Sequence, residues 1–303
     1  MSCDFSVNLA GVTLKNPVMT ASGTFGSGME YADFIDLNRL GAVVTKGVSS
    51  VPWEGNPTPR IAEVPSGMLN AIGLQNPGID VFIERDLVFL EQFDTKVIVN
   101  VCGHTPEEYV EVVERLANQP RVDLLEINVS CPNVREGAIA FGTKAESLFD
   151  ITSRIKKVAR QPIILKLTPN VTSIAEMARA AEAGGADALS LINTITGMKI
   201  DVERRKFVLA NHTGGLSGPA IHPIAVRMVY EASQAVTIPV IGIGGVMNAE
   251  DALELMLAGA SAIAVGTANF HDPKATDKVI EGMEAYAKRH DLHSITELIG
   301  AVS

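Results

Sequence analysis

Eight short apolar runs, spaced along the whole chain, constrain its fold more than any other feature. They cover residues 17–21, 42–46, 96–101, 124–128, 163–167, 188–192, 239–243 and 262–266. Each run is nearly continuous rather than alternating, which is typical of parallel strands covered on both faces. A helix, or an insert long enough for one, follows each run. This regular alternation predicts an α/β fold of the (β/α)8 TIM-barrel type.

The segments between the runs carry signals for the start and end of helices. Thr105 precedes Pro106 and has Glu108 three residues later, which is the spacing of a capping box. A second segment begins at Asn248 and stops at Gly259, where glycine can end a helix. These signals place helices after the third and seventh apolar runs, as a barrel requires.

The chain outside the eight runs adds three expectations. Residues 6–14 (SVNLAGVTL) predict an N-terminal hairpin. No linker or low-complexity segment interrupts the chain, so residues 1–303 are expected to form a single domain. Residues 47–78 and 193–221 are too long for simple turns. Because they follow the second and sixth runs, they predict long loops on the C-terminal face, where barrel enzymes place their chemistry.

Polar residues at the ends of the apolar runs are candidates for a site on that face. A single asparagine at a strand end can be a cap or a turn residue. Lys166 interrupts the run 163–167, where a lysine either reaches the surface or points as a cation into the barrel mouth. Together these side chains predict a ring of donors and acceptors. The ring contains Lys46, Asn100, Asn128, Lys166, Asn193 and Thr194.

Glycine-rich loops follow the last two runs. Residues 242–245 read GIGG, and residues 265–268 read VGTA. Either loop alone could be a tight turn. Loops after strands seven and eight are the usual phosphate site of barrels, because glycine lets backbone N–H groups approach an anion. A third loop, TGGLSG at 213–218, is expected at the same mouth.

The cysteines are few and far apart. Cys3 and Cys102 suit buried packing, whereas Cys131 stands in NVSCPNV, just after the fourth run. Cys131 could fill a tight corner, bind a metal or act as a reactive thiol. No histidine is placed to activate it as a nucleophile, but a thiol can serve as a general base. The chain has no CxxC pair, so neither a metal site nor an iron–sulfur cluster is expected in it.

Charge and terminal composition exclude several classes of partner. The formal net charge of −10 disfavours nucleic acid and anionic membranes. The N-terminus lacks the features of a signal peptide, and no apolar run approaches the ~18 residues of a membrane span. An odd number of scattered cysteines fits a reducing compartment. The protein is therefore expected in the cytoplasm.

Long motifs in a fixed order resemble the catalytic subunit of class 1 dihydroorotate dehydrogenases. The combination of CPN, FGT and ILKLTPN is most similar to the NAD-linked class 1B form. The motifs are TKGVS (45–49), GMLNAIGLQNPG (67–78), NVSCPNV (128–134), ILKLTPNV (164–171), INT (192–194), TGGLSGPAI (213–221), IGIGGV (241–246) and VGTA (265–268).

The resemblance implies a flavoprotein that oxidises dihydroorotate to orotate in pyrimidine biosynthesis. Cys131 would be the catalytic base, and Lys166 would stabilise charge on FMN, which accepts the hydride. The residues that it implies for FMN are Ser22, Lys46, Gly47, Asn100, Asn128, Lys166, Ile192, Gly218, Gly244, Gly245, Gly266 and Thr267. Those that it implies for the substrate are Lys46, Asn70, Ala71, Ile72, Gly73, Leu74, Asn128, Asn133, Asn193 and Thr194.

The resemblance also implies a second subunit, which carries FAD and a [2Fe-2S] cluster and passes electrons to NAD. The catalytic chains would pair as a homodimer within a heterotetramer. Two alternatives stay open. One is the fumarate-linked class 1A enzyme, with the same substrate and another acceptor. The other is a non-redox barrel, either a lyase or isomerase acting on a sugar phosphate or a silent binding subunit.

Overall fold

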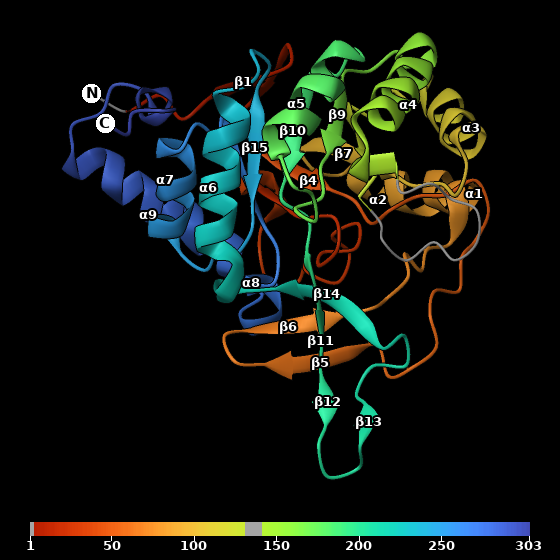
Figure 1. Cartoon of the computed structure of the whole chain (residues 1–303). Coiled ribbons are helices and arrows are strands. Elements are labelled where there is room, and N and C mark those ends of the chain that lie inside the picture. The colour runs from red at the N-terminus through yellow and green to blue at the C-terminus, as the bar shows by residue number, and fades with distance from the viewer. Residues whose placement is uncertain (1–2, 131–140) are drawn as a thin grey trace.

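The structure of the chain is a computed structural model, which describes residues 3–130 and 141–303. Within these residues, eight parallel strands close into a barrel (Figure 1). All eight predicted runs become barrel strands, and the predicted fold class is confirmed. In barrel order the strands are β3 (Val18–Thr20), β4 (Ala42–Val44), β7 (Lys96–Val101), β8 (Leu124–Asn128), β9 (Ile163–Lys166), β10 (Ala188–Leu191), β15 (Val240–Ile243) and β16 (Ala262–Val265).

Helices surround the barrel in Figure 1 and bury its outer face. The longer ones are α3 (Pro106–Leu116), α4 (Ala145–Val158), α5 (Ile174–Ala183), α6 (His222–Ser233), α7 (Ala249–Leu257) and α9 (Ala275–Arg289). The short ones are α1 (Gly78–Val81), α2 (Val88–Leu90) and α8 (Ala268–His271). A π-helical segment, η2 (Phe82–Leu87), joins α1 to α2, and 3-10 turns are η1 (Leu37–Arg39), η3 (Phe141–Thr143), η4 (Pro219–Ile221) and η5 (Ile295–Leu298).

The helix starts follow the predicted caps with one correction. The Thr105 hydroxyl accepts from the Glu108 N–H at 3.3 Å, as predicted for α3. The reciprocal half of that capping box is wrong, because the Glu108 carboxylate accepts from the His104 N–H at 2.6 Å instead. His104 Nδ1 also lies 3.3 Å from the same carboxylate, so both contacts of Glu108 are with His104. A complete capping box forms in α7, between Asn248 and Asp251.

The predicted N-terminal hairpin is present as β1 (Val7–Leu9) and β2 (Val12–Leu14), which pair antiparallel. Ala10 and Gly11, at its turn, both have positive φ, as a tight hairpin turn requires. The Asp4 N–H donates to the His293 carbonyl at 2.8 Å, so the two ends of the chain lie side by side (Figure 1).

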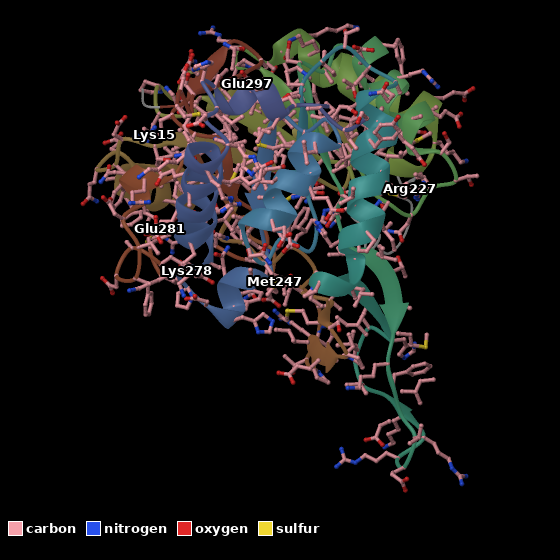
Figure 2. All side chains as sticks on the ribbon, turned by 90° about the vertical axis from the view of Figure 1, so that its left-hand side faces the viewer. Lys15, Arg227, Met247, Lys278, Glu281 and Glu297 are labelled. Carbon is pink, nitrogen blue, oxygen red and sulfur yellow. The ribbon has the colours of Figure 1, made fainter. Side chains whose placement is uncertain are left out.

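The two long connections form a sheet where the sequence predicted loops. Its four antiparallel strands have the order β11–β14–β6–β5. The pairing of β14 with β6 joins segments far apart in the chain, so neither segment reveals it alone. A two-stranded arm continues away from the barrel, and Figure 2 shows its side chains projecting outward. The bounds are β5 (Ile61–Val64), β6 (Gly67–Asn70), β11 (Ile195–Met198), β12 (Ile200–Asp201), β13 (Lys206–Phe207) and β14 (Thr213–Ser217).

The apolar side chains divide between two clusters. The large one fills the barrel and the space under its helices, and it consists mainly of Val, Ile, Leu, Ala and Met. The small one, formed by Ala62, Leu69, Ala71 and Leu209, lies against the four-stranded sheet. Among the described residues, no helix is both long and apolar enough to cross a lipid bilayer.

Candidate active site

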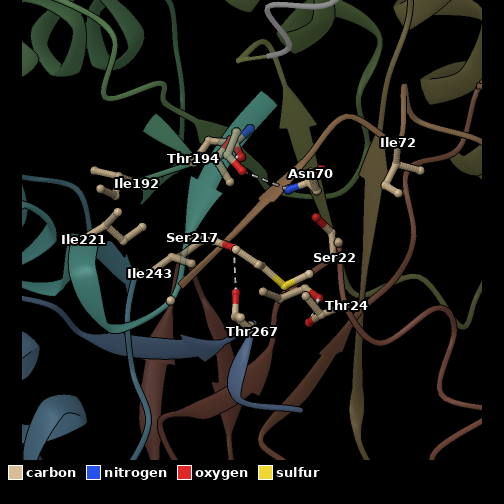
Figure 3. Close-up of a pocket in the computed structure, with 18 of the residues that line it drawn as sticks. Ser22, Thr24, Asn70, Ile72, Ile192, Thr194, Ser217, Ile221, Ile243 and Thr267 are labelled. Carbon is tan, nitrogen blue, oxygen red and sulfur yellow. Dashed lines mark hydrogen bonds between the residues drawn. The ribbon is translucent and has the colours of Figure 1, made fainter. Parts of the chain in front are cut away.

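A pocket lies between the carboxyl ends of the barrel strands and the four-stranded sheet (Figure 3). Parallel barrel strands all end at one rim, so residues distant in the sequence meet there. Side chains such as Lys46 and Lys166 reach the pocket from the barrel. Met68, Asn70 and Ser217 reach it from the sheet. We call this cavity the barrel pocket.

Most residues predicted for the site line the barrel pocket. Ala71 does not, because its side chain packs in the small apolar cluster behind the sheet. Cys131 and Asn133 lie outside the described residues. The predicted residues that line the pocket are Ser22, Lys46, Gly47, Asn70, Ile72, Gly73, Leu74, Asn100, Asn128, Lys166, Ile192, Asn193, Thr194, Gly218, Gly244, Gly245, Gly266 and Thr267.

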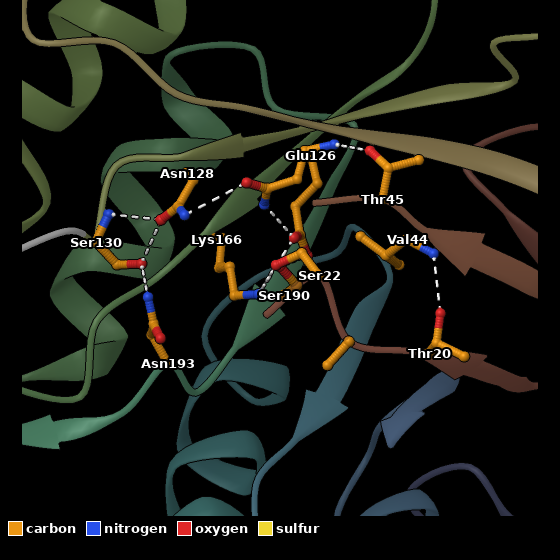
Figure 4. A network of polar contacts seen from close by, with 12 residues as sticks. Thr20, Ser22, Val44, Thr45, Glu126, Asn128, Ser130, Lys166, Ser190 and Asn193 are labelled. Carbon is orange, nitrogen blue, oxygen red and sulfur yellow. Dashed lines mark hydrogen bonds and ion pairs between the residues drawn. The ribbon is translucent and has the colours of Figure 1, made fainter. Parts of the chain in front are cut away.

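The predicted asparagines are joined by hydrogen bonds (Figure 4). Asn193 Nδ2 donates to Ser130 Oγ at 2.6 Å, and Ser130 Oγ donates to Asn128 Oδ1 at 2.9 Å. Asn128 Nδ2 in turn donates to Asn100 Oδ1 at 3.4 Å. The Tyr109 hydroxyl donates to the Asn128 carbonyl at 2.7 Å and fixes the end of β8. The amide groups therefore face the pocket in defined orientations.

Lys166 does not reach the surface, because only 5% of the residue is exposed. Its ammonium group donates to Ser22 Oγ at 3.1 Å and to Glu126 Oε1 at 3.2 Å. Of the two placements considered from sequence, the structure has the buried one, at the wall of the barrel pocket.

Glu126 is the main feature of the site that the sequence analysis missed. It is 2% exposed and accepts from Asn100 Nδ2, Lys166 Nζ and Ser190 Oγ. The strand register brings these groups together, since Asn100 lies opposite Glu126 and Lys166 lies opposite Ser190. Its signal in the sequence is a carboxylate within the apolar run 124–128, just as Lys166 is a charged residue within the run 163–167.

The glycine loops lie at the pocket and pack closely against α6. Gly244 and Gly245 have φ of +134° and +71°, a region that side chains disfavour. A Cβ at Gly245 would lie 2.6 Å from the His222 Cβ. The His222 ring bonds to the Gly244 carbonyl at 2.8 Å. Packing therefore requires these glycines, and it leaves the backbone of the loop bare toward the pocket.

The loop after β16 connects the barrel to the sheet above it. The Thr267 hydroxyl donates to Ser217 Oγ at 2.8 Å, as Figure 3 shows. Within residues 3–130 and 141–303, no group of three or more His, Cys, Asp or Glu side chains could hold a metal ion.

Polar strand ends, a buried lysine and glycine loops meet at one mouth of this (β/α)8 barrel. These features define a class of barrel enzymes that bind anionic ligands. Within that class, the sequence model of the family described as dihydroorotate dehydrogenase matches residues 4–286 of this chain. The chain belongs to the dihydroorotate dehydrogenase family, and it is therefore an oxidoreductase of a flavin-linked kind.

Three relatives are similar to the chain over nearly its whole length, and each is named dihydroorotate dehydrogenase B (NAD(+)), catalytic subunit. The one from Lachnoclostridium phytofermentans is 67% identical and covers 98% of this chain and 99% of its own. The one from Alkaliphilus metalliredigens is 58% identical, with 99% of each chain covered. The one from Geotalea uraniireducens is 58% identical and covers 99% of this chain and 98% of its own. The resemblance to the NAD-linked type is confirmed.

Proposed function

We propose that the chain oxidises dihydroorotate to orotate in pyrimidine biosynthesis, with NAD as the final acceptor. The observation that carries the proposal is its identity, over nearly its full length, to catalytic subunits of that name. The ring of polar side chains at the barrel pocket supports it. The fumarate-linked type and the non-redox barrel remain the alternatives that experiment must exclude.

The barrel pocket fits FMN in the chemistry of its lining. Gly244, Gly245, Gly266 and Thr267 would hold the phosphate, since bare backbone and a hydroxyl suit an anion. A Cβ at Gly244 would lie 2.7 Å from the Ala225 Cβ and 3.3 Å from Ile192 Cγ1, so the close packing of the loop against α6 requires glycine there. When bound, FMN supplies the acceptor for a hydride from the substrate. The residues proposed to line the rest of the flavin are Ser22, Lys46, Gly47, Asn100, Asn128, Lys166, Ile192 and Gly218.

The substrate would lie against the amide side chains of the barrel pocket. Asparagine can both donate and accept, which suits the edge of a planar pyrimidine. Asn128 and Asn193 share the Ser130 hydroxyl, so each is held in a fixed orientation. Lys46 would hold the substrate carboxylate. The other residues proposed for the substrate are Asn70, Ile72, Gly73, Leu74, Asn133 and Thr194.

Two residues carry the proposed chemistry. Cys131 would remove the proton from the substrate, and it follows Ser130 directly in the chain. Lys166 would stabilise negative charge that builds up in the pocket, as a fixed and buried cation can. The role of Cys131 rests on the sequence resemblance alone.

We also propose that the chain works with a second subunit carrying FAD and a [2Fe-2S] cluster, as a homodimer of catalytic chains within a cytoplasmic heterotetramer. The relatives' designation as catalytic subunits supports a separate partner. Met198 at the end of β11, and Ile200, Val202 and Phe207 in the arm formed by β12 and β13, are exposed. Exposed apolar surface of this kind favours a protein contact.

Acceptor assays test the proposal. The chain is supplied with dihydroorotate and either fumarate alone, NAD alone, or NAD with the FAD and iron–sulfur subunit. We expect turnover with NAD only when the partner is present, and little turnover with fumarate. Rapid turnover with fumarate and no partner would establish the fumarate-linked type. Failure with every acceptor would favour the non-redox alternatives.

A further inference from the structure

Glu126 is a buried carboxylate that the proposed chemistry leaves without a role (Figure 4). We propose that it is a positioning residue. One carboxylate holds Lys166 and Asn100 at the wall of the barrel pocket and offsets the charge of Lys166 there. The inference rests on the proposed function, because its consequence is measured at the flavin.

The two carboxylate oxygens of Glu126 have different partners. Oε1 accepts from Asn100 Nδ2 at 2.6 Å and from Lys166 Nζ at 3.2 Å. Oε2 accepts from Ser190 Oγ at 2.8 Å. The serine thus fixes the rotation of the carboxylate, and both pocket-lining side chains depend on the same oxygen. Moving or removing that oxygen would take one hydrogen bond from Lys166, which keeps its bond to Ser22, and one from Asn100, which keeps its bond from Asn128.

The position of Glu126 is costly for stability alone. Leu124, Leu125 and Ile127 around it in β8 are fully buried. Taking a carboxylate and an ammonium out of water costs several kcal/mol per ion, and apolar pairs of similar volume often serve stability as well or better. Both oxygens of Glu126 are bonded, and Lys166 lies at a ligand pocket. An effect on the ligand therefore explains this buried pair better than a gain in stability does.

The electrostatic consequence has a definite sign. Lys166 alone would present a full buried positive charge to the pocket, and charges interact strongly where water is excluded. Glu126 cancels most of that charge at longer range. Without its negative charge, the pocket would favour the more negative, reduced form of a bound flavin more strongly.

The substitution Glu126→Gln separates charge from shape. Its Oε1 can still accept from Asn100 and Lys166, and its Nε2 can donate to the Ser190 hydroxyl, which accepts as well as donates. Glu126→Leu removes the hydrogen bonds as well. Asp123→Asn is a matched control, since it also removes one negative charge. Asp123 lies just before β8, at the end of the strand away from the barrel pocket, and its carboxylate pairs with Lys96.

The experiment measures the midpoint potential and the dissociation constant of FMN for the wild type and the three variants. All are purified with FMN present, because a ligand stabilises the folded chain by mass action. The wild type is first checked for FMN uptake and reduction by dihydroorotate. Failure at that step would contradict the proposed function and leave the positioning role without its premise.

We expect Glu126→Gln to raise the equilibrium constant for reduction of the bound flavin at least tenfold. For a two-electron couple, this is a midpoint potential about 30 mV more positive. Asp123→Asn should stay within twofold of the wild type, and Glu126→Leu should weaken FMN binding at least tenfold. The proposal is overturned if Glu126→Gln stays within twofold of the wild type. It is equally overturned if Asp123→Asn shifts the potential by the same amount, or if Glu126→Leu binds FMN normally.

Discussion

Replacing Lys166 with methionine should destabilise the protein strongly, because it breaks the buried pair with Glu126. The two side chains are 6% and 2% exposed, so water cannot take the place of the lost cation. Glu126 would keep its bonds from Asn100 and Ser190 but would remain a buried charge without a counterion. Breaking such a pair typically costs about 3–5 kcal/mol.

A double variant shows whether the cost arises from the stranded charge. Lys166→Met with Glu126→Leu removes both charges and loses three hydrogen bonds to neutral partners, those with Ser22, Asn100 and Ser190, at about 1 kcal/mol each. Its total loss should therefore be about 3 kcal/mol. It should be more stable than Lys166→Met alone, because the single variant adds the lost Ser22 bond to the cost of the broken ion pair. Ser22→Ala, which removes only the other partner of Lys166, should cost about 1 kcal/mol.

Urea unfolding of the flavin-free protein at neutral pH, followed by circular dichroism, measures these differences. Unchanged m-values would show that the variants differ in stability and not in the surface exposed on unfolding. A loss below about 1 kcal/mol for Lys166→Met would refute the reasoning from a buried ion pair. A double variant less stable than the single one would refute it as well.

Three further predictions follow from particular contacts. Gly245→Ala should abolish FMN retention on a gel-filtration column and lower stability by about 2–3 kcal/mol, because its Cβ would overlap His222 at positive φ. Cys131→Ser should slow flavin reduction about 10²- to 10⁴-fold in stopped-flow traces while FMN binding survives, and near-normal reduction would place the base elsewhere. Burial raises the pKa of Glu182, but hydrogen bonds from Thr237 and Ile238 lower it more, so the net shift is downward. A carboxylate whose pKa is lowered by folding stabilises the fold at pH values above its unfolded pKa. That stability is lost as the pH falls through the folded pKa. The Glu182 carboxylate lies partly in water, so its contribution is small. Glu182→Gln should therefore lower the stability of the fold by about 0.5–1 kcal/mol at neutral pH and leave it unchanged in acid. A gap that persists in acid would contradict this reading.

The barrel could be predicted from sequence because its strands carry their own signal. Runs such as 96–101 and 163–167 are apolar almost throughout, as strands covered on both faces must be. Their polar ends also predicted the site, since all parallel strands of a barrel end at one rim.

The four-stranded sheet could not be predicted in this way. Strands β6 and β14 lie on segments far apart in the chain, and their pairing buries only a small apolar cluster. Glu126 was missed for a different reason. It lies inside an apolar run and not at the end of one. On the inward face of β8 it comes two residues before Asn128 and lies beside Asn100 of β7.

The single-domain prediction has a simple test of its own. If the barrel and the sheet form one unit, thermal unfolding should give one transition by both calorimetry and circular dichroism. Two separate transitions would mean that the sheet and arm melt independently of the barrel.

Anaerobic reduction of the bound flavin by dihydroorotate tests the central claim most directly. The purified chain, supplied with FMN, should show the visible spectrum of an oxidised flavin. One equivalent of dihydroorotate should bleach it and release one equivalent of orotate, without any partner subunit. A chain that takes up no flavin, or a bound flavin that dihydroorotate leaves oxidised, would contradict the account.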